Sequence, residues 1–408
     1  MATLRTSRHI LAAIYRRLLL RTRLVGITGS CGKTTTTRLV AAVLATKGRV
    51  QSSPPESFNF PTKIASNVLR TNPLSRFAVY ELSGAFPGRM ARSVRVMRPD
   101  VGVVTQVGYD HYRNFRDLDL IAREKSGLIA GLPEGGVAVL NHDDDRVAAM
   151  GRLTRARALT YGLGEGADVR GVQVSSRWPE RLQLSVVHAG LRRHVHTRLL
   201  GDHWAHAVLA AIGVGLAMGV ALEDAIAAIA DVEPVAGRMH PHEIPGGITM
   251  VDDTWKAPHP SVEASLRWLQ QARASRRIAV IGTVSDYPSK SARAYRRTVR
   301  HALAAADLVV CVGDRASSAL RAHASDDRSR LQVCRSVREL RASLARLLGA
   351  GDLVLLKGAR RDHLERLVLD RTQPLACWRD SCALYGRCTD CALRHQPERP
   401  GSAAECRA

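Results

Sequence analysis

Short apolar runs alternate with segments of helical periodicity along most of the chain. Three runs, at 24–30 (LVGITGS), 77–82 (FAVYEL) and 101–107 (VGVVTQV), have the length of buried β-strands and are rich in β-branched residues. Between them, residues 33–44 and 89–97 carry the spacing of apolar side chains that is typical of helices. Strands that alternate with helices in this way predict a parallel α/β sheet.

The pattern changes in the middle of the chain and then restarts. Polar and apolar residues alternate at 168–200, which predicts a small antiparallel patch, and the Ala-rich run 203–229 predicts one or two helices. After the segment 232–237, buried-type strands again alternate with helical segments, in the runs ITMVDD, RIAVIGTV, DLVVCVGD and DLVLLKG. From Arg371 onward both periodicities are lost.

These changes predict an α/β protein with a P-loop-type parallel sheet in its central domain, followed by a smaller Rossmann-like α/β domain and a Cys-rich tail. The composition agrees, because 45% of the 408 residues are hydrophobic and 24% are charged, which excludes a disordered chain. The predicted parts are a basic N-terminal helix at 1–22, the central domain at 23–232, the second α/β domain at 233–370 and the tail at 371–408.

The first 23 residues superficially resemble a targeting peptide. Arg16 and Arg17 break its apolar stretch, and no small-residue cleavage site follows before Gly26. We interpret the segment as a basic amphipathic helix, with a role at a membrane surface as the alternative. No apolar run approaches 18 residues, so no membrane span is expected. The eight cysteines without a secretory signal indicate a reducing, cytoplasmic compartment.

The net charge of +23 by itself favours nucleic acid or anionic surfaces as partners. However, the arginines are spread along the whole chain, and aromatic residues are only 4%, too few for base-stacking platforms. Nucleic-acid binding is therefore disfavoured. Of the 60 basic residues only 7 are lysines, so each lysine is informative in a chain that uses arginine almost everywhere.

The strongest chemical signal is the segment GITGSCGKTTTT at 26–37, in which a strand leads through a glycine loop into a helix. Backbone N–H groups of such a loop and the positive end of the helix bind phosphates, with lysine on the β/γ-phosphates and threonine on Mg²⁺. The alternative to a phosphate-binding loop is a helix start whose glycines have no function. The predicted nucleotide-binding residues are Gly29, Gly32, Lys33, Thr34 and Thr35.

This loop resembles that of the Mur ligase superfamily, the ATP-dependent amide ligases that include the peptidoglycan peptide ligases and folylpolyglutamate synthase. The family loop reads TG-x-x-GKT, and the D-alanyl-D-alanine-adding branch is the most similar. Further segments resemble family motifs in the same order, from residue 24 to about 370. They are AVYELSGAFPGRM (78–90), RPDVGVVTQVGYDHYRNF with IAREKSGLI (98–129), VLNHDDDRV (139–147), VAGRM (235–239), MVDDTWKAPHPS (250–261) and LLKGAR (355–360).

The resemblance implies a role for five residues outside the loop. Glu81 would bind one Mg²⁺ and His111 a second, and Lys125 would be the lysine that is carbamylated in many members. Arg238 would reach the nucleotide phosphates and Asp253 the ribose side, with 232–237 as a hinge. Each residue also has a non-functional interpretation. Lys125 would be a solvated helix lysine, His111 a polar residue at a strand end, and Arg238 and Asp253 a surface pair near a linker.

The chemistry of amide synthesis favours these assignments. A carboxylate takes the γ-phosphate of ATP to give an acyl phosphate, and an amine then displaces phosphate. Negative charge builds on phosphoryl oxygens throughout, so catalysis needs positioning and cations. Lys33 and two Mg²⁺ ions meet that need. A carbamate can form only on a primary amine, so arginine could not replace Lys125.

Three departures from the family pattern concern the substrate side. In this sequence about 20 residues precede the loop, too few for the UDP-sugar-binding domain of the cell-wall ligases, so a nucleotide-sugar substrate held in the usual way is not expected. Lys256 and Pro258 stand where the family has asparagines, and a G-x-HN-x-x-N segment is replaced around His203 and His206. The ATP machinery is expected to be intact, and the substrate side remodelled.

The tail carries four cysteines within fifteen residues, a number and spacing that suit tetrahedral Zn²⁺, with an iron–sulfur cluster as the second choice. The alternative is a reduced cysteine tail without metal. Some relatives that amidate lipid-linked precursors carry a zinc ribbon, but within the central domain. The predicted ligands are Cys377, Cys382, Cys388 and Cys391, with His395 and Cys406 in reserve.

We therefore predict an ATP-dependent carboxylate–amine ligase that forms an acyl phosphate and releases ADP and phosphate, on a peptide-like or amino-acid substrate related to the cell wall. The alternative within enzymes is an amidating ligase that receives ammonia from a glutaminase partner, and a folate or poly-amino-acid ligase is a third. From a different class, a nucleotide-dependent nucleic-acid-binding module would use the tail and the positive charge.

Overall fold

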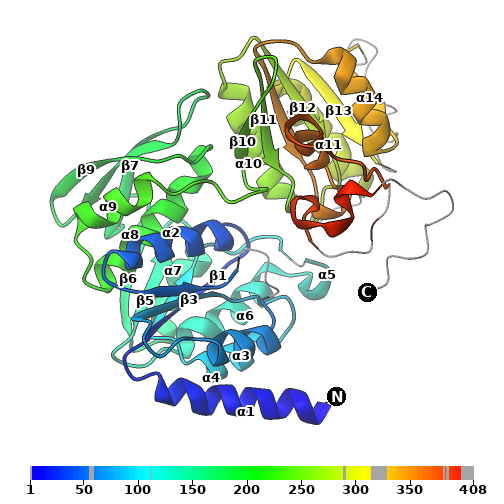
Figure 1. The fold of residues 1–408 in the computed structure, drawn as a ribbon. Coiled ribbons are helices and arrows are strands. Elements are labelled where there is room, and N and C mark those ends of the chain that lie inside the picture. The colour runs from blue at the N-terminus through cyan, green and yellow to red at the C-terminus, as the bar shows by residue number, and fades with distance from the viewer. Residues whose placement is uncertain are drawn as a thin grey trace. The chain divides into compact units, whose positions relative to one another are not determined.

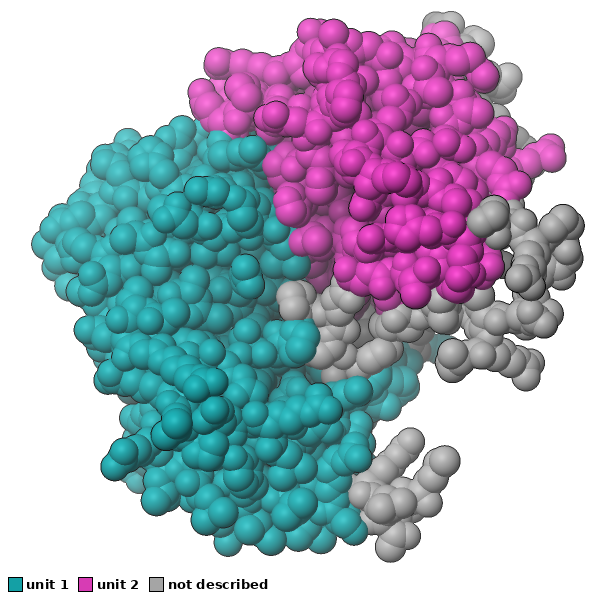
Figure 2. All heavy atoms as spheres, viewed as in Figure 1, with its two compact units in different colours: residues 1–176, 181–235 teal, residues 177–180, 236–408 magenta. Residues whose placement is uncertain are grey.

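The structure is a computed structural model, and the chain divides into two compact units (Figure 2). The first unit comprises residues 1–176 and 181–235, and the second comprises 177–180 and 236–408. The described residues are 2–54, 59–110, 112–287, 291–313, 329–379, 382 and 386–396.

The first unit is built on a mixed sheet, which runs in the order β2-β3-β1-β4-β5-β6-β7-β8-β9 among the described residues (Figure 1). Strands β2 to β7 pair in parallel, and β7, β8 and β9 pair antiparallel, which places the predicted antiparallel patch at one edge. The strands are β1 (Arg23–Thr28), β2 (Val50–Ser52), β3 (Phe77–Glu81), β4 (Val101–Val104), β5 (Val137–Asn141), β6 (Arg157–Gly162), β7 (Val169–Ser175), β8 (Gln183–His188) and β9 (Leu191–His196).

Helices cover both faces of this sheet. On one face lie α2 (Lys33–Ala45), α8 (Ala205–Ala217) and α9 (Leu222–Ala230), which share a hydrophobic core. Helices α1, α3, α4, α6 and α7 share a separate core with the sheet. These are α1 (Ala2–Leu18), α3 (Pro61–Leu69), α4 (Arg89–Met97), α6 (Leu118–Ala130) and α7 (Asp145–Ala148), and the short α5 (Tyr112–Phe115) precedes α6.

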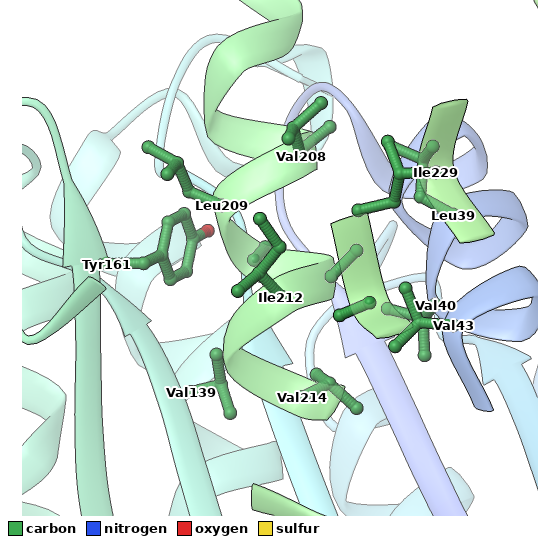
Figure 3. Close-up of a cluster of buried hydrophobic side chains, with 14 of the residues drawn as sticks. Leu39, Val40, Val43, Val139, Tyr161, Val208, Leu209, Ile212, Val214 and Ile229 are labelled. Carbon is green, nitrogen blue, oxygen red and sulfur yellow. The ribbon is translucent and has the colours of Figure 1, made fainter. Parts of the chain in front are cut away.

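The central strands are apolar on both sides because successive side chains enter different cores. In β1, Val25 and Ile27 belong to the α2/α8 core, whereas Leu24 belongs to the other. Figure 3 shows α2 and α8 in the first core, where Val40 and Ile212 are fully buried. Burial on both faces explains why the sequence shows continuous apolar runs here instead of alternation.

The second unit contains a smaller sheet of order β10-β11-β15-β12-β13-β14 among the described residues. Of these described strands, β10 pairs antiparallel with β11, and the other neighbours pair in parallel. Its strands are β10 (His240–Ile244), β11 (Ile248–Asp253), β12 (Arg276–Ile281), β13 (Leu308–Val312), β14 (Leu331–Cys334) and β15 (Asp352–Lys357), and its helices are α10 (His259–Gln271), α11 (Ser291–Ala305), α14 (Val337–Leu347) and α15 (Arg366–Thr372).

The chain after α15 has no long element in its described part. Two short 3₁₀ turns, Cys388–Asp390 and Ala392–His395, follow the loss of periodicity seen in the sequence. Among the described residues, no helix has both the length and the apolar character needed to cross a membrane.

Candidate active site

The glycine loop joins β1 to α2 at the carboxyl edge of the first sheet. A Cβ atom on Gly29, whose φ is +142°, would lie 1.8 Å from the Thr105 hydroxyl, so the loop can pass this point only as glycine. Gly32 has φ +80° and caps the start of α2 at Lys33. Gly32 offers no side chain to cap the helix, and the first N–H groups of a helix have no intrahelical partner, so this helix start suits a phosphate.

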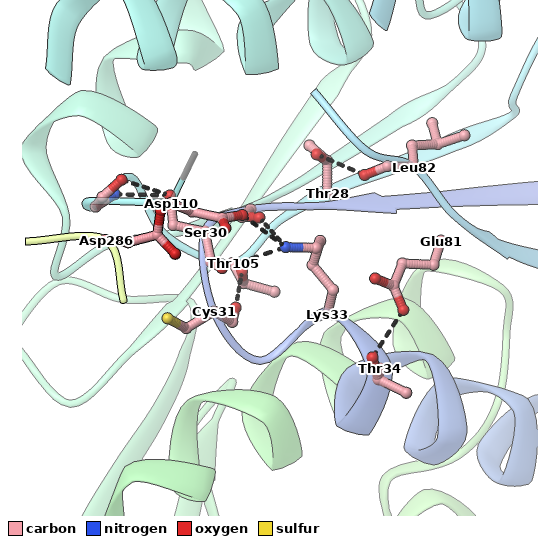
Figure 4. A network of polar contacts seen from close by, with 12 residues as sticks. Thr28, Ser30, Cys31, Lys33, Thr34, Glu81, Leu82, Thr105, Asp110 and Asp286 are labelled. Carbon is pink, nitrogen blue, oxygen red and sulfur yellow. Dashed lines mark hydrogen bonds and ion pairs between the residues drawn. The ribbon is translucent and has the colours of Figure 1, made fainter. Parts of the chain in front are cut away.

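Lys33 is buried and lies back over its own loop (Figure 4). Its Nζ donates to the carbonyl oxygens of Gly29 at 2.6 Å and Ser30 at 3.2 Å, and pairs with the Asp110 carboxylate at 3.2 Å. Burial opposes the charge, but the carboxylates of Asp110 and Glu81 outweigh it and raise the pKa of Lys33. The lysine is therefore a fixed cation at the place where phosphate is expected.

Thr34 and Glu81 form the second polar contact at this edge. The Thr34 hydroxyl donates to Glu81 Oε2 at 2.8 Å, and both residues are buried. They meet because β1 and β3 are parallel neighbours whose carboxyl ends lie at the same edge. A hydroxyl and a carboxylate are the hard oxygen ligands that Mg²⁺ prefers, so the residues predicted for that ion fit it.

Lys125 lies on α6 and only 1% of its surface is exposed. The interpretation of Lys125 as a solvated helix lysine is therefore wrong. Its neighbour Glu124 accepts hydrogen bonds from the N–H groups of Gly88 at 2.7 Å and Met90 at 2.6 Å, which attaches α6 to the segment after β3. The predicted second Mg²⁺ ligand, His111, lies outside the described residues.

Sequence reasoning missed how the turn after β5 supports the site. The Asn141 amide donates to the Thr105 carbonyl at 2.8 Å, and Asp144 accepts from the Val107 N–H at 2.7 Å. Both bonds hold the segment that runs from β4 toward Asp110. The role of Asp110, which pairs with Lys33, was also missed. Asp110 directly precedes His111 in a segment that resembles the DH motif of the family, so the sequence did contain a signal for it.

In the second unit, Asp253 ends β11 and lies beside Lys357, which ends the parallel strand β15. Asp253 Oδ2 accepts from Lys357 Nζ at 2.8 Å and from the Ser265 hydroxyl at 2.6 Å. Asp253 is buried, so its interpretation as part of a surface pair is wrong; Arg238 is half-buried. The pair stands at the carboxyl edge of an open α/β sheet, where such folds bind ligands.

The neighbouring Asp252 is held by the tail. Its Oδ2 accepts from Arg387 Nη2 at 2.6 Å and from the Gly237 N–H at 3.1 Å, and its Oδ1 accepts from the Thr254 hydroxyl at 2.6 Å. Side-chain exposure is 6% for Arg387 and 1% for Asp252. The tail thus supplies a buried cation to two family-like segments, VAGRM and MVDDTWKAPHPS, a contact that no sequence motif marked.

The tail cysteines do not come together as predicted. Cys388 instead lies beside His363 and Glu365, and the potential metal-ligand atoms of these three residues are all within 4.8 Å of one another. Among the described residues, this is the one such group of three or more metal-binding side chains. Of the four predicted thiolate ligands, this group contains Cys388 alone. Arg366 Nε also donates to Cys388 Sγ at 3.1 Å. Burial, with Glu365 as a second cause, raises the pKa of Cys388 to about 12.

The glycine loop, its buried lysine and the threonine–carboxylate pair define the first unit as a nucleotide-binding module on a parallel sheet. Family models agree: the Mur ligase middle domain matches residues 27–215, and the glutamate ligase domain of Mur ligases matches 237–360. The chain therefore belongs to the Mur ligase family, and it is an ATP-dependent ligase that forms peptide bonds.

Among curated relatives, the chain is similar to UDP-N-acetylmuramoyl-tripeptide–D-alanyl-D-alanine ligases. It is 32% identical to that of Mycobacterium tuberculosis over 375 residues, which cover 86% of this chain and 73% of the relative. It is 28% identical to that of Bacillus subtilis, over 61% of this chain and 53% of the relative.

Solved structures show the same fold. MurF from Acinetobacter baumannii superposes with a TM-score of 0.81 at 24% identity, covering 90% of this chain and 80% of that one. MurF ligase from Thermotoga maritima in complex with ADP gives 0.78 at 22% identity, covering 89% and 82%.

Proposed function

We propose that this ligase joins the carboxylate of a muramyl-peptide-like acceptor to the amine of a D-alanyl-D-alanine-like dipeptide, at the expense of ATP, in the cytoplasm. The observation that carries the proposal is the paired arrangement of Lys33 with Asp110 and Thr34 with Glu81 around the glycine loop. The similarity to D-alanyl-D-alanine-adding ligases over most of the chain supports the substrate class.

In the first step, a carboxylate oxygen of the acceptor attacks the γ-phosphorus of ATP, and ADP leaves. Lys33 stays cationic because its two carboxylate neighbours raise its pKa, so it offsets the charge that develops on the phosphoryl oxygens. The loop N–H groups orient the β-phosphate. Thr34 and Glu81 would hold Mg²⁺, which neutralises the phosphates when bound.

In the second step, the amine attacks the acyl carbon, phosphate leaves with the bonding electrons, and the amine loses a proton. We propose that Lys125 carries a carbamate, formed when its neutral amine adds to CO₂ and releases a proton. Lys125 is buried on α6, near Gly84 and the carboxyl end of β3. This position supports a carbamate that would bind a second Mg²⁺ together with His111. Contacts of Arg238 with the nucleotide phosphates, contacts of Asp253 with its ribose and the hinge at 232–237 stay predictions.

The test is turnover of the purified protein with a panel of acids and amines, with hydroxylamine as a trap for the acyl phosphate. Acid-dependent ADP release with a trapped hydroxamate, absent from Lys33→Ala, is the expected result. The panel includes ammonia, so ammonia as the preferred amine would replace this proposal by the amidating, glutaminase-coupled alternative. ADP release that requires nucleic acid, and not a carboxylic acid from the panel, would favour the nucleic-acid-binding alternative.

For the tail, we propose that a Zn²⁺ ion is held by Cys388, His363 and Glu365. Sulfur, imidazole nitrogen and carboxylate oxygen form a donor set that zinc accepts, and Arg366 would donate to the bound thiolate. His363 Nδ1 lies 3.3 Å from Cys388 Sγ and 3.7 Å from Glu365 Oε1, so the three candidate ligands face one another. Within the described residues, Glu365 Oε2 is also buried without a hydrogen-bond partner.

The metal content of the purified protein tests this site. About one zinc per chain is expected, retained in Cys382→Ser and lost in Cys388→Ser, because Cys382 is outside the cluster. Loss of zinc in both variants would restore the four-cysteine prediction, and no zinc in the parent protein would remove the site.

A further inference from the structure

Helix α1 is amphipathic, but its apolar face points away from the rest of the first unit. Ile10, Leu11, Ile14 and Leu18 lie at helical spacing on one stripe, and each is more than half exposed. They are four of the ten large hydrophobic side chains that are exposed among the described residues. Exposed apolar side chains that form one continuous stripe are typical of an interaction surface, unlike scattered ones.

The opposite face of α1 is attached through polar side chains. The Tyr15 hydroxyl donates to the Thr71 carbonyl at 2.8 Å, and Arg16 donates to the Met97 carbonyl at 2.8 Å and pairs with Asp100 at 3.1 Å. Ala12 packs into the core of the unit. Figure 1 shows α1 along the outside of α3 and α4. These bonds hold the helix in the orientation that exposes its apolar stripe.

The surroundings of the stripe are basic. Arg8 and Arg17 are exposed and flank the stripe on its two sides, and Arg21 follows it. No acidic residue occurs before Glu56 in the sequence, and α3 and α4 contain none. Two copies of α1 placed stripe to stripe would bring these arginines together, which disfavours self-association through this face.

We propose that α1 is a docking surface for an anionic lipid bilayer, with the stripe in the boundary between headgroups and acyl chains and the flanking arginines on lipid phosphates. A basic amphipathic helix with exposed leucine and isoleucine has the chemistry for this position. Attachment through α1 would place the ligase at the membrane surface. The inference does not depend on which amide bond the enzyme forms.

Co-sedimentation of the full chain with vesicles tests the proposal. We expect binding to vesicles of equimolar phosphatidylcholine and phosphatidylglycerol, weaker binding to phosphatidylcholine alone, and a decrease with added salt. Ile14→Glu with Leu18→Glu should abolish binding. Arg8→Gln with Arg17→Gln should weaken it by about fivefold for each charge.

The matched control is Leu153→Glu with Leu191→Glu, which changes two exposed apolar residues elsewhere in the first unit and should bind as the parent does. Ligase turnover with soluble substrates should be the same in all these variants. Absence of binding to anionic vesicles overturns the proposal, as does binding that survives Ile14→Glu with Leu18→Glu. A dimer in sedimentation velocity that the same double variant dissociates would assign the stripe to a second copy instead.

Discussion

The two units place charged residues at the same position in the fold and use them differently. In the first unit, Lys33 and Glu81 stand at the carboxyl edge around a loop that is shaped to receive an anion. In the second unit, Asp252 and Asp253 stand at the corresponding edge, where buried Arg387 and Lys357 pair with them. Lys33 likewise pairs with buried Asp110, so both units hold ion pairs at this edge, and the glycine loop is what distinguishes the first unit.

The largest effect is expected from Lys125→Arg. Arginine keeps the positive charge but cannot form a carbamate, so ligation should be abolished while ATP binding remains measurable. Turnover and ATP titration by calorimetry on the same sample check this. Full activity in the variant would remove the carbamate and reduce Lys125 to a buried structural cation, like those of the second unit.

Lys33→Ala should lower kcat by about 10²–10³-fold, the usual loss when one preorganised charge-stabilising donor is removed. Steady-state ADP release measures it. The control is Lys63→Ala, which changes an exposed lysine on α3 and should behave as the parent does. Equal rates in the two variants would contradict the assigned role of the glycine loop.

Arg387→Ala should lower the free energy of unfolding of the second unit by about 3–5 kcal/mol, because it leaves Asp252 buried without its cation. Chemical denaturation followed by tryptophan fluorescence measures the loss. Arg297→Ala removes an exposed arginine from half-buried Glu263 in the same unit, where His301 remains within 3.3 Å, and should have a much smaller effect. An equally small effect in both variants would mean that the tail does not hold the motif.

The smallest effect is a difference in acid sensitivity between the units. Burial, reinforced by His240, lowers the pKa of His242 in the second unit from its usual 6.5. The folded state therefore resists protonation of His242, so this residue contributes stability that is fully present above pH 6.5 and is lost as the pH falls below that value.

In the first unit, hydrogen bonds from the N–H groups of Leu163 and Gly164 outweigh burial and lower the pKa of Asp143 from 3.8. Its contribution is present above that value and is lost only at lower pH. Denaturation midpoints between pH 7 and 5 should decline for the second unit first, and His242→Gln should flatten that decline. A parallel decline of both units would contradict the assignment.

Much of the site was predictable because its residues follow strands that the sequence marks clearly. A strand that leads through a glycine loop into a helix marked Lys33 and Thr34 from the local sequence. The family resemblance supplied Glu81, Lys125 and Asp253, and the structure buries all three.

The sequence by itself determined the two α/β sheets, the nucleotide loop and the helical character of residues 2–18, because these depend on local periodicity and turn chemistry. Only the tertiary structure decided which partners distant residues take. The pairs Lys33–Asp110 and Asp252–Arg387 join residues 77 and 135 positions apart. The outward direction of the apolar stripe on α1 likewise depends on the bonds of Tyr15 and Arg16 to other elements. A hydrophobic pattern shows that a helix has two faces, and packing alone decides which face is buried.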